Sequence, residues 1–388
     1  MRLIAGLLVA AAAFTPCVPP PDDRGGWRTK TSEAAQAEKL DRVFDYIRQS
    51  TKNVGLPVVK DGWLICERYF GLGRREATPN LASCGKAFTS TAAGILLHER
   101  PGLFPDGLDQ RVFTPRYLPP EALRDPAKSG IRPGQLPAMP AGIAGNNPGS
   151  VRGKPVRLAE PGPGGWQAMV DERAAAVPLW TKPGEGHSYA TASVHRVSMM
   201  LRHVTGVELE QWIAKKIAAP MGWGRWGFGY QRPEIRHTPG GGGIAMRATD
   251  MLRFAWLPVN GGRRGGAQLV PAACVRHCGR MPPYNPHSPY SLQFGVNGGG
   301  HAAGAPRDAF GKHGSGGHAF YAAPSMKPAV FKPGGRDSQS TEKTTVPPPP
   351  PGAMPAGGDS RPGWKRSPCE GGGEAAVQTL RRVAGALR

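Results

Sequence analysis

The sequence predicts an α+β fold in which helices flank an antiparallel sheet. Asp61-Gly62 separates two short apolar runs, a pattern typical of a β-hairpin. Residues 87–97 are apolar on nearly every side, which is typical of a buried helix. Two later segments, 291–296 and 318–322, have the composition of strands. A hairpin, a buried helix and two later strands together predict this fold class.

The composition indicates a folded body with long loops. The chain has 388 residues, and its 55 glycines and 42 prolines together make up a quarter of them. The formal net charge is +21, yet the basic residues are scattered and cluster only as pairs such as Lys215-Lys216. A nucleic-acid-binding protein would carry a dense basic stripe with interleaved aromatic residues. We therefore expect an arginine-rich surface and no nucleic-acid partner, while attraction to an anionic cell envelope stays open as an alternative.

Residues 1–20 have the features of a secretory signal peptide. An early arginine precedes an apolar run that ends in an Ala11-x-Ala13 pattern. The run is too short to span a bilayer. Cys17 follows Pro16, where a lipid-attachment signal needs a small residue, so lipidation is not expected. The segment predicts an exported protein, periplasmic or secreted, without a transmembrane segment.

Helices are expected on both sides of the central motif. Residues 32–50 place four apolar side chains on one helical face, namely Leu40, Val43, Phe44 and Ile47. Beyond residues 101–182, which are rich in loops, an apolar stripe from 194 to 204 predicts a helix that ends at Gly206. The next helix is expected to stop at Pro220, and Thr249 is expected to cap the one after it.

The composition divides the chain after residue 331. Residues 32–331 are expected to form one catalytic domain, preceded by the signal peptide and a linker. Residues 332–373 are rich in glycine and proline and predict a flexible insert. Residues 374–388 have a helical pattern and are expected to complete the catalytic fold.

A serine and a lysine at the start of the buried helix suggest acyl-transfer chemistry. Ser83 and Lys86 are three residues apart, so their side chains would be neighbours on a helix. Serine is a nucleophile at neutral pH only when a base takes its proton, and a buried lysine near a helix start can be that base. The same spacing recurs at Ser340 and Lys343, so the buried helix behind Ser83 is what favours this hypothesis.

No metal or cofactor is predicted. Cys274, His277 and Cys278 lack a second ligand pair at zinc-like spacing. The glycine run 240–243 superficially resembles a dinucleotide-binding loop. No suitable strand precedes it and no acidic residue follows it at the required distance, so this interpretation is dismissed.

Three short motifs carry a resemblance to a known family. They are Ser83-x-x-Lys86, Tyr189-Ala190-Thr191 and Lys312-His313-Gly314. In this order and at these separations the chain resembles the serine β-lactamase and penicillin-binding protein superfamily, in particular the class C-like serine hydrolases. The resemblance implies an antiparallel sheet flanked by helices, a second mainly helical lobe, and a site between the lobes.

The resemblance also implies a role for each matching residue. Ser83 would be the acylated nucleophile, and Lys86 its general base or the partner that tunes the base. Tyr189 would pass protons to the leaving group, while Lys312 would bind a substrate carboxylate and support Tyr189. The backbone N–H groups of Ser83 and Ser315 would form the oxyanion hole.

The chain departs from the family pattern at two positions of the substrate cleft. Thr191 stands where the family usually has asparagine, and His313 where it commonly has threonine. Thr191, His313 and Gly314 would line the substrate-binding wall. The bulk of the imidazole and its titration near neutrality change the expected substrate choice. Activity on another amide or ester is therefore expected rather than activity on β-lactams.

We predict an exported serine hydrolase that cleaves an amide or ester through a Ser83 acyl-enzyme. Its substrate would be a small or peptide-like molecule, with cell-wall material as one source. A first alternative is a catalytically impaired relative that binds cell-wall peptide-like ligands. A second is a basic envelope-binding scaffold in which the motifs are coincidental.

Overall fold

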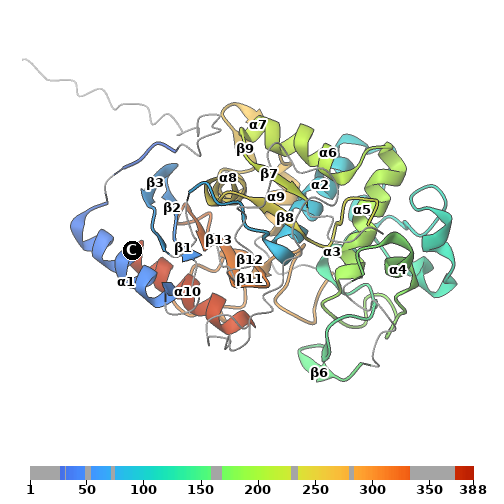
Figure 1. Ribbon diagram of the computed structural model, residues 1–388. Coiled ribbons are helices and arrows are strands. Elements are labelled where there is room, and N and C mark those ends of the chain that lie inside the picture. Colours follow the sequence, from blue (N-terminus) through green and yellow to red (C-terminus); the bar gives the residue numbers. More distant parts are fainter. Residues whose placement is uncertain are drawn as a thin grey trace, which may run out of the picture.

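We describe a computed structural model of the protein, drawn in Figure 1. The structure describes residues 27–30, 32–48, 54–70, 75–158, 168–228, 235–278, 284–332 and 372–388. The expected signal peptide and nearly all of the expected insert lie outside these residues. Within them, no helix combines the length and the apolar character that crossing a membrane requires.

A six-stranded sheet forms the centre of the molecule, and every neighbouring pair of its strands is antiparallel. This confirms the expected fold class. In spatial order the strands are β11 (Gly295–Val296), β12 (Phe310–Gly314), β13 (His318–Ala322), β14 (Pro328–Lys332), β2 (Val58–Lys60) and β3 (Trp63–Cys66).

The turn residues explain two features of this sheet. Asp61 and Gly62 both have positive φ angles, 51° and 80°, as the tight turn between β2 and β3 requires. The expected hairpin is therefore confirmed. By contrast, the expected strand 291–296 is reduced to β11, because Gln293 has a φ of 74° and the chain turns there. An extended strand cannot pass through that conformation.

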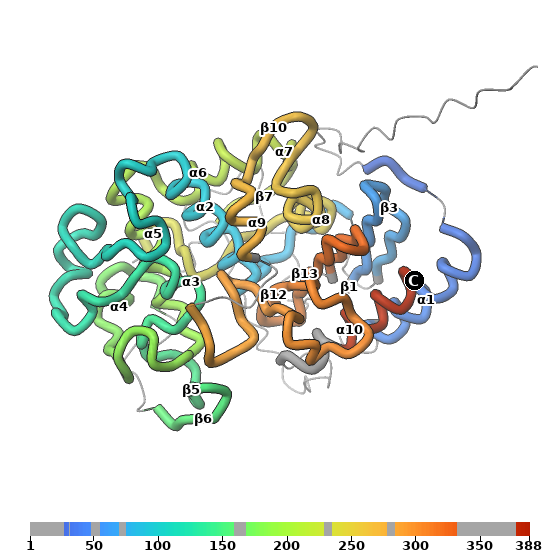
Figure 2. The backbone as a smooth tube through the Cα atoms, turned by 180° about the vertical axis from the view of Figure 1, so that it is seen from behind, coloured from blue at the N-terminus to red at the C-terminus, as the bar shows by residue number. Residues whose placement is uncertain are grey.

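One face of the sheet is covered by the first and last described helices. These are α1 (Ala34–Arg48) and α10 (Gly372–Ala386), which lie side by side in Figure 1 and Figure 2. Leu40 and Ile47 of α1 and Val383 of α10 belong to one buried apolar cluster with the sheet residues Val58 and Val330. The two expected terminal helices are thus confirmed as a pair on one face.

The opposite face carries α8 (Ala248–Val259) and, beyond it, the buried helix α2 (Gly85–Glu99). Phe254 of α8 joins the layers, because its ring lies 6.0 Å from that of Phe320 on β13 and 3.9 Å from that of Phe88 on α2. Eleven residues of α2 are buried, from Gly85 to Leu96. The apolar composition of α2 is therefore explained by the elements that surround it, which include α5 and α8.

A mainly helical region packs on the far side of α2. Its principal helix is α5 (Thr191–Thr205), which ends at Gly206 with a φ of 70°, as expected. The remaining helices are α3 (Gln135–Ala138), α4 (Asp171–Ala176), α6 (Leu209–Ile213), α7 (Ala219–Met221) and α9 (Ala272–Cys278). Short antiparallel pairs are β1 (Val54–Gly55) with β4 (Tyr69–Phe70), β5 (Gly149–Val151) with β6 (Lys154–Val156), β7 (Trp226–Phe228) with β8 (Ile244–Met246), and β9 (Arg263–Arg264) with β10 (Ala267–Gln268).

Two expected helix boundaries were wrong. Pro220 does not stop its helix, because it occupies the first turn of α7, where a missing N–H is tolerated, and the helix ends at Gly222. Thr249 does not cap α8, which begins at Ala248. Its side chain is instead fully buried within the first turn.

Candidate active site

A strained turn presents Ser83 at the start of α2. Residues Ala82–Cys84 form one turn of 3-10 helix that leads into α2. Ala82 has a φ of 47°, which is unusual for a residue with a Cβ, and its N–H is held by the Asn80 side chain at 2.9 Å. Such backbone strain costs on the order of 1–3 kcal/mol and is concentrated at functional sites. The turn leaves Ser83 only half-buried.

Lys86 contacts the Ser83 hydroxyl directly. Its Nζ lies 2.9 Å from Ser83 Oγ and 2.5 Å from the carbonyl oxygen of Gly241. The lysine is only 1% exposed, and burial lowers its pKa to about 7. At neutral pH a large fraction of Lys86 is therefore an uncharged amine that can accept the serine proton.

Tyr189 and Lys312 complete the group predicted from the motifs. Lys312 lies on β12 and donates from Nζ to the Tyr189 hydroxyl at 2.8 Å. Burial, and next the nearby charge of Lys86, lower the Lys312 pKa well below its usual range. Burial raises the Tyr189 pKa, with the Ser83 side chain acting in the opposite direction. Tyr189 is thus a neutral phenol between the second lysine and the serine.

Tyr290 belongs to this group and was not predicted. Its hydroxyl accepts a hydrogen bond from Lys312 Nζ at 2.6 Å and donates to Gln293 Oε1 at 2.9 Å. Its ring lies edge-on to that of Tyr189, 6.1 Å away. Its place just before an expected strand was the only signal in the sequence. We call Ser83, Lys86, Tyr189, Lys312 and Tyr290 the Ser83 cluster.

Glycines allow the backbone segments of the site to approach one another closely. A Cβ at Gly314 would lie 2.1 Å from the Leu81 carbonyl oxygen, so β12 can pack against the Ser83 turn only with glycine there. A Cβ at Gly85 would lie 2.9 Å from Gly242 Cα. The run 240–243, dismissed as a dinucleotide loop, therefore wraps the Ser83 turn and supplies the carbonyl that Lys86 contacts.

The remaining predicted residues are placed differently. Thr191 is the first residue of α5 and is buried, with its methyl group directed at Gly241. His313 alternates with Lys312 along β12, so it lies on the other face of the sheet, where its ring is 6.1 Å from that of Tyr321. Ser315 is exposed in the turn after β12. The structure brings Ser83, Lys86, Tyr189, Lys312 and Gly314 together, but it does not group His313 with them.

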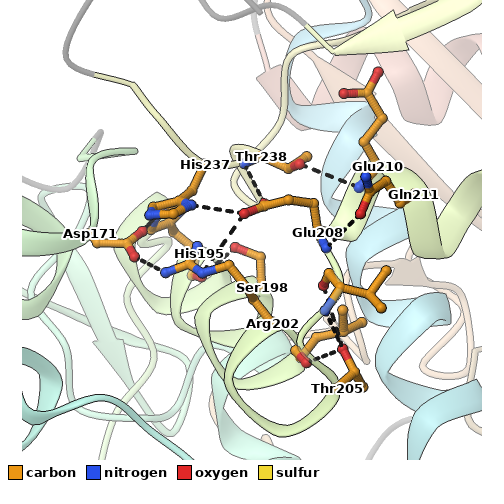
Figure 3. Close-up of polar contacts among 12 residues, drawn as sticks. Asp171, His195, Ser198, Arg202, Thr205, Glu208, Glu210, Gln211, His237 and Thr238 are labelled. Carbon is orange, nitrogen blue, oxygen red and sulfur yellow. Dashed lines mark hydrogen bonds and ion pairs between the residues drawn. The ribbon is translucent and has the colours of Figure 1, made fainter.

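A second polar cluster lies on the other side of the glycine run 240–243, and Figure 3 shows its residues. We call Asp171, His195, Arg202, Glu208 and His237 the Asp171 cluster. The buried Asp171 carboxylate accepts hydrogen bonds from His195 Nε2, at 2.8 Å, and from Arg202. Burial alone would raise the Asp171 pKa, but His195 and Arg202 outweigh it and lower the pKa to about 2. Glu208 accepts from His237 Nδ1 at 2.8 Å.

The Asp171 cluster reaches the Ser83 cluster through the glycine run. His195 Nδ1 accepts from the Gly240 N–H at 3.3 Å, so its Nε2 carries the proton given to Asp171. The Gly240 carbonyl in turn accepts from Thr89 of α2 at 2.6 Å. Because Gly241 contacts Lys86, this chain of bonds holds the backbone that positions the lysine.

Comparisons with solved structures agree with this architecture. The fold is similar to a family VIII carboxylesterase, at 16% sequence identity over 92% of this chain and 99% of that chain, with a TM-score of 0.63. It is also similar to EstA from Arthrobacter nitroguajacolicus Rue61a, at 15% identity over 93% and 98% of the two chains, with a TM-score of 0.60. A penicillin-binding protein homolog from Caulobacter crescentus matches at 16% identity over 79% and 93%, with a TM-score of 0.59.

Sequence comparisons identify the family. No curated protein sequence matches the chain. The family model described as Beta-lactamase matches residues 37–331, which include every residue of both clusters and the whole six-stranded sheet up to Phe331. This chain therefore belongs to the β-lactamase family, and its fold is the one shared by β-lactamases and penicillin-binding protein homologs.

Proposed function

We propose that this protein hydrolyses neutral esters through an acyl-enzyme formed on Ser83. The observation that carries the proposal is the 2.9 Å contact between Ser83 Oγ and the buried Lys86 amine. A lysine whose pKa is lowered to about 7 can remove the serine proton near neutral pH. Hydroxyl and base are thus already in contact, at hydrogen-bond distance, before substrate arrives.

The reaction follows from the positions of these groups. As Ser83 Oγ bonds to the ester carbonyl carbon, its proton passes to Lys86, and the carbonyl oxygen takes up the negative charge. The backbone N–H groups of Ser83 and Ser315 are the proposed donors to that oxygen. When the ester C–O bond breaks, a proton passes through Tyr189 to the leaving oxygen and an alcohol departs. Water then cleaves the acyl-enzyme, releasing a carboxylic acid and restoring Ser83.

The surroundings of Lys312 favour a substrate without a carboxylate. Its Nζ contacts two phenol oxygens and the residue is only 3% exposed. A lysine so deeply buried and already donating to two phenol oxygens is poorly placed to meet a substrate carboxylate. His313, the other basic group of the motif, is on the opposite face of the sheet. β-Lactams and peptides with a free carboxylate would therefore lack a cationic partner at this wall.

Esters also suit the proton relay better than amides. An alkoxide or phenoxide leaves more readily than an amide nitrogen, which must be protonated as the bond breaks. Tyr189 is the proposed relay, and burial holds its phenol protonated, with a raised pKa. The similar structure described as a family VIII carboxylesterase is consistent with this choice. Export remains part of the proposal and depends on residues 1–20.

The test combines product analysis with intact-protein mass spectrometry. The full-length protein is mixed with p-nitrophenyl butyrate or with benzylpenicillin, and both the adduct and the product are followed. We expect a butyryl adduct and nitrophenol release from the wild type, no turnover from Ser83→Ala, and little reaction with the penicillin. Ser315→Ala is the matched control, because it keeps the backbone N–H and should stay active. A folded wild type that releases no nitrophenol above Ser83→Ala would refute the proposal.

A further inference from the structure

A cavity of about 390 Å³ lies behind the Ser83 cluster, among α2, α5 and α9. Its walls come from the same elements that carry the site. On α2, Ser90, Gly94 and Leu97 continue the helical face that begins with Lys86, spaced by three or four residues. On α5, Val197 and Met200 line it six and nine residues after Thr191.

The interior of the cavity is apolar. Leu97, Val197, Met200, Leu292 and Phe294 supply most of its bulk. One of its few hydroxyls, that of Thr91, donates to the Ala87 carbonyl at 2.9 Å and so is satisfied within α2. A cavity without polar partners does not hold ordered water, whereas apolar cavities of less than half this size bind benzene-sized molecules.

The mouth of the cavity is polar and tends toward negative charge. Exposed Asp106, Asp109 and His98 line it, together with the exposed Ala273 of α9. Among the lining residues that the structure describes, none is a lysine or an arginine, although Arg132, outside the lining, donates to Asp109 at 3.2 Å. An anionic ligand would therefore be disfavoured at the entrance, and a neutral one would not.

A buried glutamine separates this cavity from the Ser83 cluster. Gln293 is fully buried, accepts from the Tyr290 hydroxyl and donates to the carbonyl of Pro137, a lining residue. Its neighbours Leu292 and Phe294 face the cavity, while Tyr290 contacts Lys312. The cavity is thus a space distinct from the one in which Ser83 would meet an ester.

We propose that this cavity is a second binding site, separate from the catalytic one, for a neutral apolar small molecule. Its volume falls within the range of small-molecule sites, roughly 300–1,000 Å³. The ligand would place a hydrocarbon or aromatic body between α2 and α5 and any uncharged polar group at the mouth. The proposal concerns binding only and does not depend on the ester hydrolysis proposed above.

The test uses two fluorescent probes that differ in charge. N-phenyl-1-naphthylamine is neutral and apolar, and 1-anilinonaphthalene-8-sulfonate adds a sulfonate to the same ring system. Titration of the full-length protein with each probe gives the two dissociation constants. We expect the neutral probe to bind at a single saturable site and the sulfonate to bind about tenfold more weakly. Equal affinities, or no saturable binding of the neutral probe, would overturn the proposal.

A pair of substitutions on α9 locates the binding. Ala272 and Ala273 are both exposed, but only Ala273 lines the cavity. Ala273→Trp should weaken binding of the neutral probe about tenfold, because the indole would occupy part of the cavity and remove some of the probe's apolar contacts. Losing the contacts of one or two groups in an apolar pocket has an effect of this size. Ala272→Trp should leave it within about twofold. Equal effects of the two variants would refute the assignment.

Two further measurements separate this site from the catalytic one. Ser83→Ala, and wild type whose Ser83 has been blocked with a phosphonate ester, should bind the probe as before. Cys274 lines the cavity, so the probe should slow its alkylation by N-ethylmaleimide. Trypsin cleaves after Arg276, so the alkylation of Cys274 is measured in a peptide that does not contain Cys278. Loss of probe binding on blocking Ser83 would place the probe in the catalytic cleft and overturn the proposal.

Discussion

The Ser83 cluster and the Asp171 cluster are both groups of hydrogen-bonded polar side chains, yet they differ in whether a basic side chain meets a carboxylate. In the described part of the chain, Lys86 and Lys312 contact hydroxyl, phenol and carbonyl oxygens but no carboxylate. In the Asp171 cluster, by contrast, Arg202 is paired with Asp171, and His237 with Glu208. One cluster leaves its buried lysines without a carboxylate, and the other pairs basic side chains with carboxylates.

The difference explains which cluster is suited to chemistry. A buried lysine without an anion loses its proton easily, and the pKa of Lys86 falls to about 7. A buried carboxylate that accepts hydrogen bonds from His195 and from the Arg202 guanidinium keeps its charge, and the pKa of Asp171 falls to about 2. Lys86 can exchange a proton near neutral pH, whereas Asp171 stays ionised there. We infer that the Asp171 cluster stabilises the fold and the backbone around Lys86, while the Ser83 cluster reacts.

The largest expected effect is the loss of the base. Lys86→Gln should lower kcat/KM for p-nitrophenyl butyrate about 10³-fold, because general-base catalysis contributes factors of this size. Lys216→Gln removes a lysine from an ion pair with Glu99 near the surface and should have little effect. Circular dichroism would show that both variants are folded. Substantial activity in Lys86→Gln would assign the base to another residue.

The next effect concerns stability rather than activity. Asp171→Asn leaves Arg202 and His195 without their carboxylate and should lower the free energy of unfolding by about 3 kcal/mol, as for other broken buried ion pairs. This corresponds to more than a hundredfold change in the unfolding equilibrium. Urea unfolding at pH 7 measures it, with the exposed neighbour Glu172→Gln as the control. kcat of the folded variant should stay within about threefold of wild type.

The same variant has a pH signature with a definite sign. The Asp171 pKa is about 2 in the folded protein and 3.8 when unperturbed, so its stabilising effect is complete above about pH 4. The effect is lost as the pH falls from about 4 to 2. The stability difference between wild type and Asp171→Asn should therefore shrink over that window. A difference that stays constant down to pH 2 would mean that the charge of Asp171 is not what stabilises the fold.

A third effect is the pH dependence of catalysis. Lys86 must be neutral to accept the Ser83 proton, and its pKa of about 7 means that protonation inactivates it below neutrality. We expect kcat/KM to fall about tenfold per pH unit below 7 and to level off above it. Asp171→Asn should show the same profile, since Asp171 does not titrate in that range. A shifted midpoint in this variant would show that the two clusters are coupled electrostatically.

The smallest expected effect comes from Tyr290. Tyr290→Phe removes one of the two phenol oxygens that contact Lys312, and one such hydrogen bond is worth up to about tenfold in rate. We expect a loss of about fivefold in kcat/KM and of about 1–3 kcal/mol in the free energy of unfolding, because the buried Gln293 Oε1 loses its donor. Tyr284→Phe, in the same segment but outside the Ser83 cluster, is the control. Equal activities of Tyr290→Phe and wild type would show that the Tyr290 hydroxyl does not contribute to catalysis.

Local patterns predicted the parts of the fold and site that depend on nearby residues. The hairpin at Asp61-Gly62 and the contact of Ser83 with Lys86 both follow from spacings of a few residues. The Asp171 cluster was missed because its members are brought together by α4, α5 and the segment before β8, which no spacing reveals. Tyr290 was missed for the same reason: its partner Lys312 is 22 residues away.

His313 was expected in the substrate cleft but lies on the other face of the sheet, and this difference has another cause. The motif groups Lys312, His313 and Gly314 by sequence, but strand residues alternate between faces. His313 therefore points toward the layer of α1 and α10, whereas Gly314 allows close contact with Leu81. A motif identifies a segment of the site, whereas the direction of each side chain depends on the strand that carries it.

The pairing of α1 with α10 has a consequence for how the protein is made. All six strands of the central sheet lie between residues 58 and 332, and α10 begins only at Gly372. During synthesis the strands can therefore be complete while the face with Val330 and Tyr321 still lacks one of its two covering helices. Nascent chains at this stage expose apolar surface and are prone to aggregate or to bind chaperones. The apolar face of the sheet would then be fully covered only after α10 has been translated, later than all of the catalytic motifs.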